Sequence, residues 1–219
     1  MKLITDAEYR GMAPDLAHDM GQPAHQYFSS MLSIIIPIHE SERTLVRTLS
    51  CLIPGVVAGV VREVILADAG SGDGTEQVAD VAGCKYMALP GPLGSRLRAA
   101  AAESRGPWLL FLRPGSVLEA GWPAEVERFW MVASDQDAPL AAVFRPDAYR
   151  ALSLGAQFRS LLRHVLGGMP KPEHGLLLSK ATYDRLGRHD ADSPDPEAQL
   201  IRAIGRRRIV MLHAAISGG

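Results

Sequence analysis

The first half of the chain alternates short apolar runs with segments of helical periodicity. Leu45, Leu49 and Leu52, for example, recur at the spacing of one helix face directly after an apolar run. Such alternation with short connections is typical of right-handed βαβ units, whose parallel strands are covered by helices on both faces. We therefore predict an α/β domain with a doubly wound, mostly parallel sheet. The expected strands are 31–37, 60–67, 85–89 and 108–112, and the expected helices are 41–52, 76–82 and 97–104.

The second half of the chain has a less regular pattern. With 219 residues, 47% of them hydrophobic, the chain is long enough for one substantial core. We expect a single domain over residues 31–219, preceded by an N-terminal leader at 1–30. The further expected elements are helices at 119–132, 156–166 and 198–204, a strand at 140–144, and edge strands at 175–178 and 209–213.

Composition excludes several classes of function. The 23 basic and 24 acidic side chains nearly cancel, so nucleic acid is not an expected partner. Cys51 and Cys84 are too few for a disulfide scaffold, which favours a cytoplasmic location. No apolar run approaches the roughly eighteen residues of a transmembrane segment. The basic residues at 156–166 and 206–208 leave two interpretations open, a solvated surface or peripheral contact with the inner face of a membrane.

A polar, glycine-rich loop follows the second expected strand. Asp68 stands at the strand end, and Gly70, Gly72 and Gly74 follow it. In open α/β sheets, ligands bind beyond the carboxyl ends of the strands. A carboxylate there can accept hydrogen bonds from a base or a ribose, while glycines allow close approach of a flat ligand. The alternative is a tight βα turn whose polar residues only cap the next helix.

Other candidate ligand-binding residues lie at comparable places. His39 and Glu40 end the first expected strand, where they could face a ligand or cap the helix at Ser41. Arg96 and Arg98 lie ahead of the fourth strand, and a guanidinium can hold a diphosphate with two parallel hydrogen bonds. Solvated surface arginines are the alternative interpretation.

Three sequence blocks in the right order, at residues 33–40, 63–75 and 104–112, resemble the family-two glycosyltransferases of GT-A fold. The resemblance implies transfer of a sugar from a UDP- or GDP-sugar donor to an acceptor, usually with inversion, and a role such as cell-envelope polysaccharide synthesis. It places the donor near Pro37, His39, Glu40 and Asp68, with Arg96 available for the diphosphate. It also implies that the third block ends in a DxD motif that binds Mg²⁺ or Mn²⁺.

The chain carries Arg113 and Gly115 where the family has the two aspartates of that motif. A guanidinium cannot ligate a divalent cation, so three hypotheses follow. Arg113 replaces the metal and no metal cofactor is required, because its fixed charge and two donors can hold the diphosphate. In the second hypothesis, the protein keeps the fold but has lost catalysis and acts as a binding or regulatory partner. In the third, Arg113 is a surface residue of a turn with altered side chains, and the protein binds a different ligand. If carboxylates from elsewhere supply a site, Mg²⁺ or Mn²⁺ is the expected ion.

The resemblance implies a catalytic base within residues 193–202, the closest match to the family's acidic pair and the helix that follows it. When Leu200 is aligned with the family's leucine, Glu197 takes the position of the key carboxylate, and Asp195 is the second candidate. Both can equally serve as cap and first-turn charge of the helix at 198–204. Glu173 and His174 precede a strand where the family often has residues that contact the acceptor. The acceptor is unknown, and a lipid-linked compound is one candidate.

Overall fold

A computed structural model describes residues 32–134, 141–147 and 169–218. The expected leader at 1–30 and the expected helix at 156–166 lie outside these residues. Among the residues that the structure describes, no helix has the length and apolar character needed to cross a bilayer.

The described residues form one eight-stranded sheet in the order β3-β2-β1-β4-β7-β6-β8-β5. Four of its seven neighbouring pairs are parallel, so the prediction of a mostly parallel α/β sheet is confirmed. The reversal of chain order on the two sides of β1 makes the gap between β1 and β4 a topological switch point. The strands are β1 (Leu32–Ile38), β2 (Val61–Asp68), β3 (Lys85–Ala88), β4 (Trp108–Phe111), β5 (Val117–Leu118), β6 (Ala141–Pro146), β7 (Leu176–Ser179) and β8 (Ile209–Ser217).

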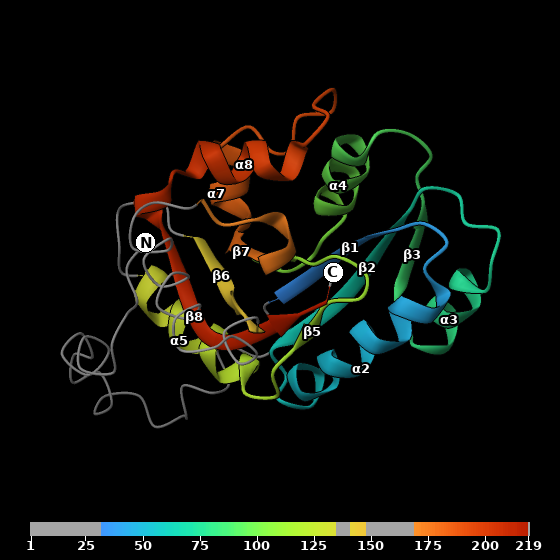
Figure 1. The fold of residues 1–219 in the computed structure, drawn as a ribbon, viewed down its shortest axis with the longest axis horizontal. Coiled ribbons are helices and arrows are strands. Elements are labelled where there is room, and N and C mark those ends of the chain that lie inside the picture. Colours follow the sequence, from blue (N-terminus) through green and yellow to red (C-terminus); the bar gives the residue numbers. More distant parts are fainter. Residues whose placement is uncertain (1–31, 135–140, 148–168, 219) are drawn as a thin grey trace, which may run out of the picture.

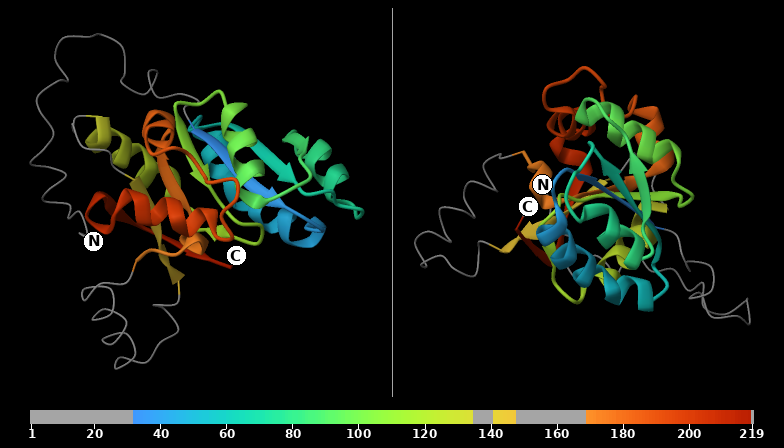
Figure 2. Two further views of the ribbon diagram at one scale, coloured as in Figure 1. Left: turned by 90° about the horizontal axis from the view of Figure 1, so that it is seen from above. Right: turned by 90° about the vertical axis from the view of Figure 1, so that its right-hand side faces the viewer.

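Helices cover both faces of the sheet (Figures 1 and 2). The first face carries α2 (Glu42–Val57), α3 (Thr75–Val81) and α5 (Trp122–Ser134). The opposite face carries α4 (Leu93–Ala102), α7 (Lys180–Arg185) and α8 (Pro196–Ile204). Two short 3₁₀ helices, η4 (Pro172–His174) and η5 (Arg206–Arg208), precede β7 and β8.

Each face of the sheet has its own hydrophobic core, because side chains alternate along every strand. Ile34 and Leu110 belong to the core beneath α2 and α5, which also contains the fully buried Trp122 and Trp130. Ile35 and the remaining alternate residues of the strands pack beneath α4, α7 and α8. Burial on both faces explains why the central strands are continuous apolar runs.

Several expected boundaries differ from the structure. β7 is not an edge strand, since it lies between β4 and β6 and runs antiparallel to both. β8 likewise lies between β6 and β5. A four-residue apolar strand has the same pattern at an edge and inside a sheet, so the sequence did not distinguish the two. The first helix is longer than expected and continues through Pro54 to Val57, and the third begins earlier, at Leu93.

Candidate functional site

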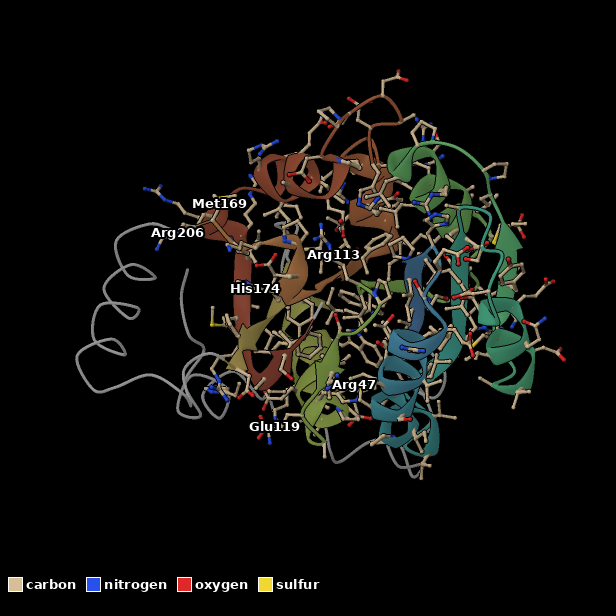
Figure 3. The ribbon with its side chains drawn as sticks, turned by 45° about the vertical axis from the view of Figure 1, so that its right-hand side comes forward. Arg47, Arg113, Glu119, Met169, His174 and Arg206 are labelled. Atoms are coloured by element: carbon tan, nitrogen blue, oxygen red, sulfur yellow. The ribbon has the colours of Figure 1, made fainter. Side chains whose placement is uncertain are left out.

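The candidate site lies at the carboxyl ends of β1, β2 and β4, around the switch point of the sheet. Arg113 follows β4 directly and begins a turn closed by a hydrogen bond from Ser116 N to Arg113 O (3.1 Å). Gly115 has a φ of 90°, so Pro114-Gly115 forms the centre of a type II turn. This turn fixes the backbone from which the Arg113 side chain extends toward α8 (Figure 3).

Arg113 and Glu197 form an ion pair. Arg113 Nη2 lies 2.7 Å and Nε 3.2 Å from the same oxygen, Oε2, of Glu197. The Glu197 side chain is only 7% exposed and that of Arg113 is 35% exposed. The structure thus brings together the predicted substitute for the metal and the predicted catalytic base, although 84 residues separate them in the sequence. One edge of the guanidinium remains open for a ligand.

Helix α2 holds the turn that carries Arg113. The buried Thr48 accepts a hydrogen bond from Gly115 N at Oγ1 (2.8 Å). Three residues later, Cys51 Sγ accepts a hydrogen bond from Leu118 N (3.2 Å). Neither residue was identified from the sequence, because nothing in the pattern of a helix shows which loop its inner face will meet.

Asp68 is fully buried, and its own loop occupies its carboxylate. It accepts hydrogen bonds from Gly70 N (2.9 Å), from the backbone and side chain of Ser71 (2.6 and 2.5 Å), and from the Tyr86 hydroxyl (2.8 Å). Burial alone would raise the pKa of Asp68, but these donors outweigh it and lower the pKa. Burial and the neighbouring Asp68 raise the pKa of Tyr86 to about 12, so its hydroxyl stays protonated. Tyr86 was not a candidate, since no motif marks the strand that carries it.

A set of hydrogen bonds joins the loop after β1 to the glycine-rich loop after β2. Glu40 has a positive φ of 47°, which is uncommon for a residue other than glycine. Its Oε1 accepts from Gly72 N (2.6 Å), and its own N donates to Ser71 Oγ (2.9 Å). Two residues later, Glu42 accepts a hydrogen bond from Gly74 N (3.2 Å). Backbone amides that could hold a phosphate are therefore occupied by the protein's own carboxylates.

The remaining predicted residues lie at or near this edge of the sheet. Arg96 Nη1 donates to the carbonyl oxygens of Ile38 (3.2 Å) and Ala67 (2.9 Å), which ties α4 to the ends of β1 and β2. Burial lowers the pKa of Arg96, while the charge of Asp68 acts in the opposite direction. Pro37 is half-buried within β1, and His39 is exposed just beyond it.

The other predicted base and acceptor residues have structural contacts. Asp195 is exposed and caps α8, because its Oδ1 accepts a hydrogen bond from Ala198 N (3.2 Å). Glu173 and His174 lie in η4, which contacts β6 and α8; His174 is labelled in Figure 3. Glu173 pairs with Lys171 Nζ at 3.1 Å. His174 Nδ1 accepts from Lys171 N at 3.4 Å.

The residues at the Arg113 turn do not suit a divalent cation. Such ions take several carboxylate or carbonyl oxygens in proteins, whereas this corner presents a guanidinium and one buried carboxylate already paired with it. Within residues 32–134, 141–147 and 169–218, no three His, Cys, Asp or Glu side chains are grouped so that they could hold a metal ion.

Comparison with known proteins agrees with this fold. The family described as Glycosyl transferase family 2 matches residues 33–112, which span β1 to the end of β4. Glucosyl-3-phosphoglycerate synthase from Mycobacterium tuberculosis, solved with Mn²⁺, UDP and glucosyl-3-phosphoglycerate, superposes with a TM-score of 0.61 at 20% identity, over 92% of this chain and 78% of that one. The chain has the GT-A fold, and its residues 33–112 match the family-two glycosyltransferases.

A second solved structure with this GT-A fold is TarS 1–349 from S. aureus, with a TM-score of 0.61 and 14% identity over 83% of this chain and 57% of that one. The same mycobacterial synthase has also been solved with Mg²⁺ and UDP, at 18% identity and a TM-score of 0.62, over 90% of this chain and 73% of that one. No curated protein sequence matches this chain significantly. The GT-A fold is thus shared with proteins that bind a divalent cation, while the corner of this chain carries Arg113.

Proposed function

We propose that this protein transfers a sugar from a nucleotide-diphosphate donor to an acceptor hydroxyl, with Arg113 in the place that a metal ion takes in its relatives. The observation that supports this proposal is the Arg113–Glu197 pair at the switch point of a GT-A sheet. A cation fixed there can stabilise the negative charge that develops on the leaving diphosphate. Because a guanidinium supplies the charge, the reaction is expected to need no added metal.

Glu197 has two roles in this proposal. Its Oε2 orients Arg113 through two nitrogens, so the guanidinium is held in place before the donor binds. A carboxylate at this position is also the expected base for the acceptor hydroxyl, which would give direct displacement with inversion. Asp195 is the weaker candidate, because its carboxylate caps α8. The nature of the acceptor, including a lipid-linked one held at a membrane surface, stays a prediction.

Calorimetry with UDP, GDP and UDP-glucose tests donor binding. We expect binding that is unchanged by EDTA and weakened roughly 10-fold to 100-fold by Arg113→Ala, since a hydrogen bond to a charged group is worth about 1.5–3 kcal/mol. Uridine, which lacks the diphosphate, should lose little affinity in the same variant. Arg62→Ala, an exposed arginine near the opposite end of β2, is the matched control. Binding that strictly requires Mn²⁺ or Mg²⁺ would contradict the role of Arg113.

A specific observation also favours a second function, that of a non-catalytic nucleotide-sugar binder. Glu197, the candidate base, is already paired with two nitrogens of Arg113, while the other edge of the guanidinium stays open for a ligand. Donor turnover separates the two functions. A transferase should release UDP from UDP-sugar in the wild type and lose this activity in Glu197→Gln while nucleotide binding remains. Nucleotide binding without turnover, over a panel of donors and acceptors, would establish the binder instead.

A further inference from the structure

An apolar groove of about 670 Å³ lies between α2 and α3, on the face of the sheet away from α4 and α8. Its walls are formed by Val46, Ile53 and Val56 of α2 and by Val78 and Val81 of α3. The cause of the groove is a mismatch in length. The 16-residue α2 runs beside the 7-residue α3, so the shorter helix leaves part of the longer one uncovered.

This groove contains most of the large apolar side chains that the described residues expose. Val81 is 89% exposed and Ile53 is 58% exposed, and Val46 and Val56 are each at least half exposed. A contiguous apolar patch on a soluble domain usually marks a surface that another segment or molecule covers. None of these residues belongs to the Arg113 site, and the contacts of that site do not explain them.

The start of the described chain lies close to one end of the groove. Leu32 N donates a hydrogen bond to Val60 O (3.1 Å), and Val60 follows α2 by only three residues. Cys84, at the other wall, precedes β3, and β3 is separated from β1 by β2 alone. Cys84 lies level with Ile34 rather than Leu32, so with strands about 4.8 Å apart and about 3.3 Å per residue, Cys84 and Leu32 are roughly 12 Å from each other within the sheet.

The residues that precede Leu32 have the length and the side chains to fill the groove. Thirty-one residues stand ahead of β1, and the N-terminal segment, residues 1–31, contains Met12, Leu16 and Met20 at intervals of four. The whole of α2 is about 24 Å long at 1.5 Å per residue, and a segment of 31 residues is long enough to span that distance.

We propose that the N-terminal segment docks in the groove between α2 and α3, with its apolar side chains against Ile53 and Val81. The segment then covers the exposed apolar side chains between the two helices. This inference is independent of the proposed transferase activity, because it concerns a different surface.

Limited trypsin digestion of the full-length protein tests the docking, with cleavage after Arg10 followed by mass spectrometry. Ile53→Asp and Val81→Asp place a charge in the groove at exposed positions, so the fold should tolerate them, which circular dichroism can verify. We expect each to raise the rate of cleavage after Arg10 at least tenfold. Met131→Asp, on α5 at a side chain that is 54% exposed, is the matched control and should leave the rate unchanged.

Three results would overturn the proposal. One is a cleavage rate that does not respond to either groove variant. Another is an equal increase in Met131→Asp, because the effect would then not depend on the groove. The third is a change of oligomeric state without a change in cleavage: the wild type sediments as a dimer, Ile53→Asp sediments as a monomer, and trypsin cleaves both after Arg10 at the same rate. That outcome would assign the groove to a second copy of the chain.

Discussion

Among single residues, Arg113 and Glu197 most affect the stability of the site. Glu197 is buried, and its charge is balanced by one guanidinium that is itself about one-third exposed. Removing one partner of such a pair leaves a carboxylate in a poorly solvated place, which costs more than the pair contributes. The pair is therefore a specific structural requirement of this corner, whatever reaction it supports.

We expect Arg113→Ala to lower the free energy of unfolding by about 1–3 kcal/mol, less than for a fully buried pair because Arg113 is partly solvated. The double variant Arg113→Ala/Glu197→Ala should recover part of this loss, since the unpaired charge is also gone. Urea denaturation of the wild type, both single variants and the double variant gives the coupling energy. Strictly additive losses would show that the two side chains do not interact in solution.

His189 is a second residue with an effect of its own, because it is buried and uncharged. Its Nδ1 lies 2.9 Å from the Tyr183 hydroxyl, and its ring packs edge-on against Phe111 with centroids 4.7 Å apart. Burial lowers the pKa of His189 from 6.5 to about 4. The unfolded chain therefore binds a proton at a higher pH than the folded protein does.

This difference in pKa predicts a loss of stability in acid. The contribution of His189 is complete above pH 6.5 and is lost progressively as the pH falls toward 4, by about 2–3 kcal/mol. We expect His189→Gln, which cannot titrate, to show a smaller change in unfolding free energy between pH 7 and pH 4.5. His39→Gln, at an exposed histidine, should keep the wild-type slope. Equal slopes in all three proteins would contradict the prediction.

Among the structural elements, α2 positions the turn after β4. Thr48 and Cys51 face inward from consecutive turns of the helix and accept hydrogen bonds from Gly115 N and Leu118 N. A helix that follows the first strand in the sequence thereby fixes a loop that follows the fourth. The placement of Arg113 depends on this contact as much as on the turn itself.

Thr48→Val keeps the shape of the side chain but removes the oxygen that accepts from Gly115 N. We expect a loss of about 1–2 kcal/mol in unfolding free energy, the typical cost of an unsatisfied buried donor. Hydrogen exchange at the Gly115 amide should also be faster in Thr48→Val than in the wild type. Thr44→Val, at an exposed threonine one turn earlier, is the control. An unchanged Gly115 exchange rate would mean that Thr48 does not hold the turn.

In the molecule as a whole, β7 joins the two halves of the sheet. It pairs with β4 on one side and with β6 on the other, and Leu177 is fully buried within it. The helices on both faces rest on this continuous sheet. We therefore expect the described domain to unfold as one cooperative unit.

Leu177→Ala tests this cooperativity. The cavity should lower the unfolding free energy by about 2–5 kcal/mol. Tryptophan fluorescence reports the core around Trp122 and Trp130, and far-ultraviolet circular dichroism reports helices on both faces. The midpoints of both signals should fall together. Separate midpoints would show that the two halves unfold independently.

Local patterns in the sequence predicted the elements well but not their long-range contacts. The alternation of apolar runs predicted β1, β2 and β4, because each signal lies within a few neighbouring residues. The partnership of Arg113 with Glu197 depends on how α8 crosses the sheet, which no local pattern reports. The interior position of β7 was missed for the same reason.

The reversed direction of β7 has a consequence for how this protein can diversify. β6 ends, and β7 begins, at the edge where β4 presents Arg113, so the connection from Pro146 to Met169 leaves and re-enters the sheet beside the site. β6 and β7 are held in register by their own pairing with each other, with β8 and with β4. The residues beside the site, and with them the choice of acceptor, can therefore change between related proteins while the sheet that supports the site stays the same.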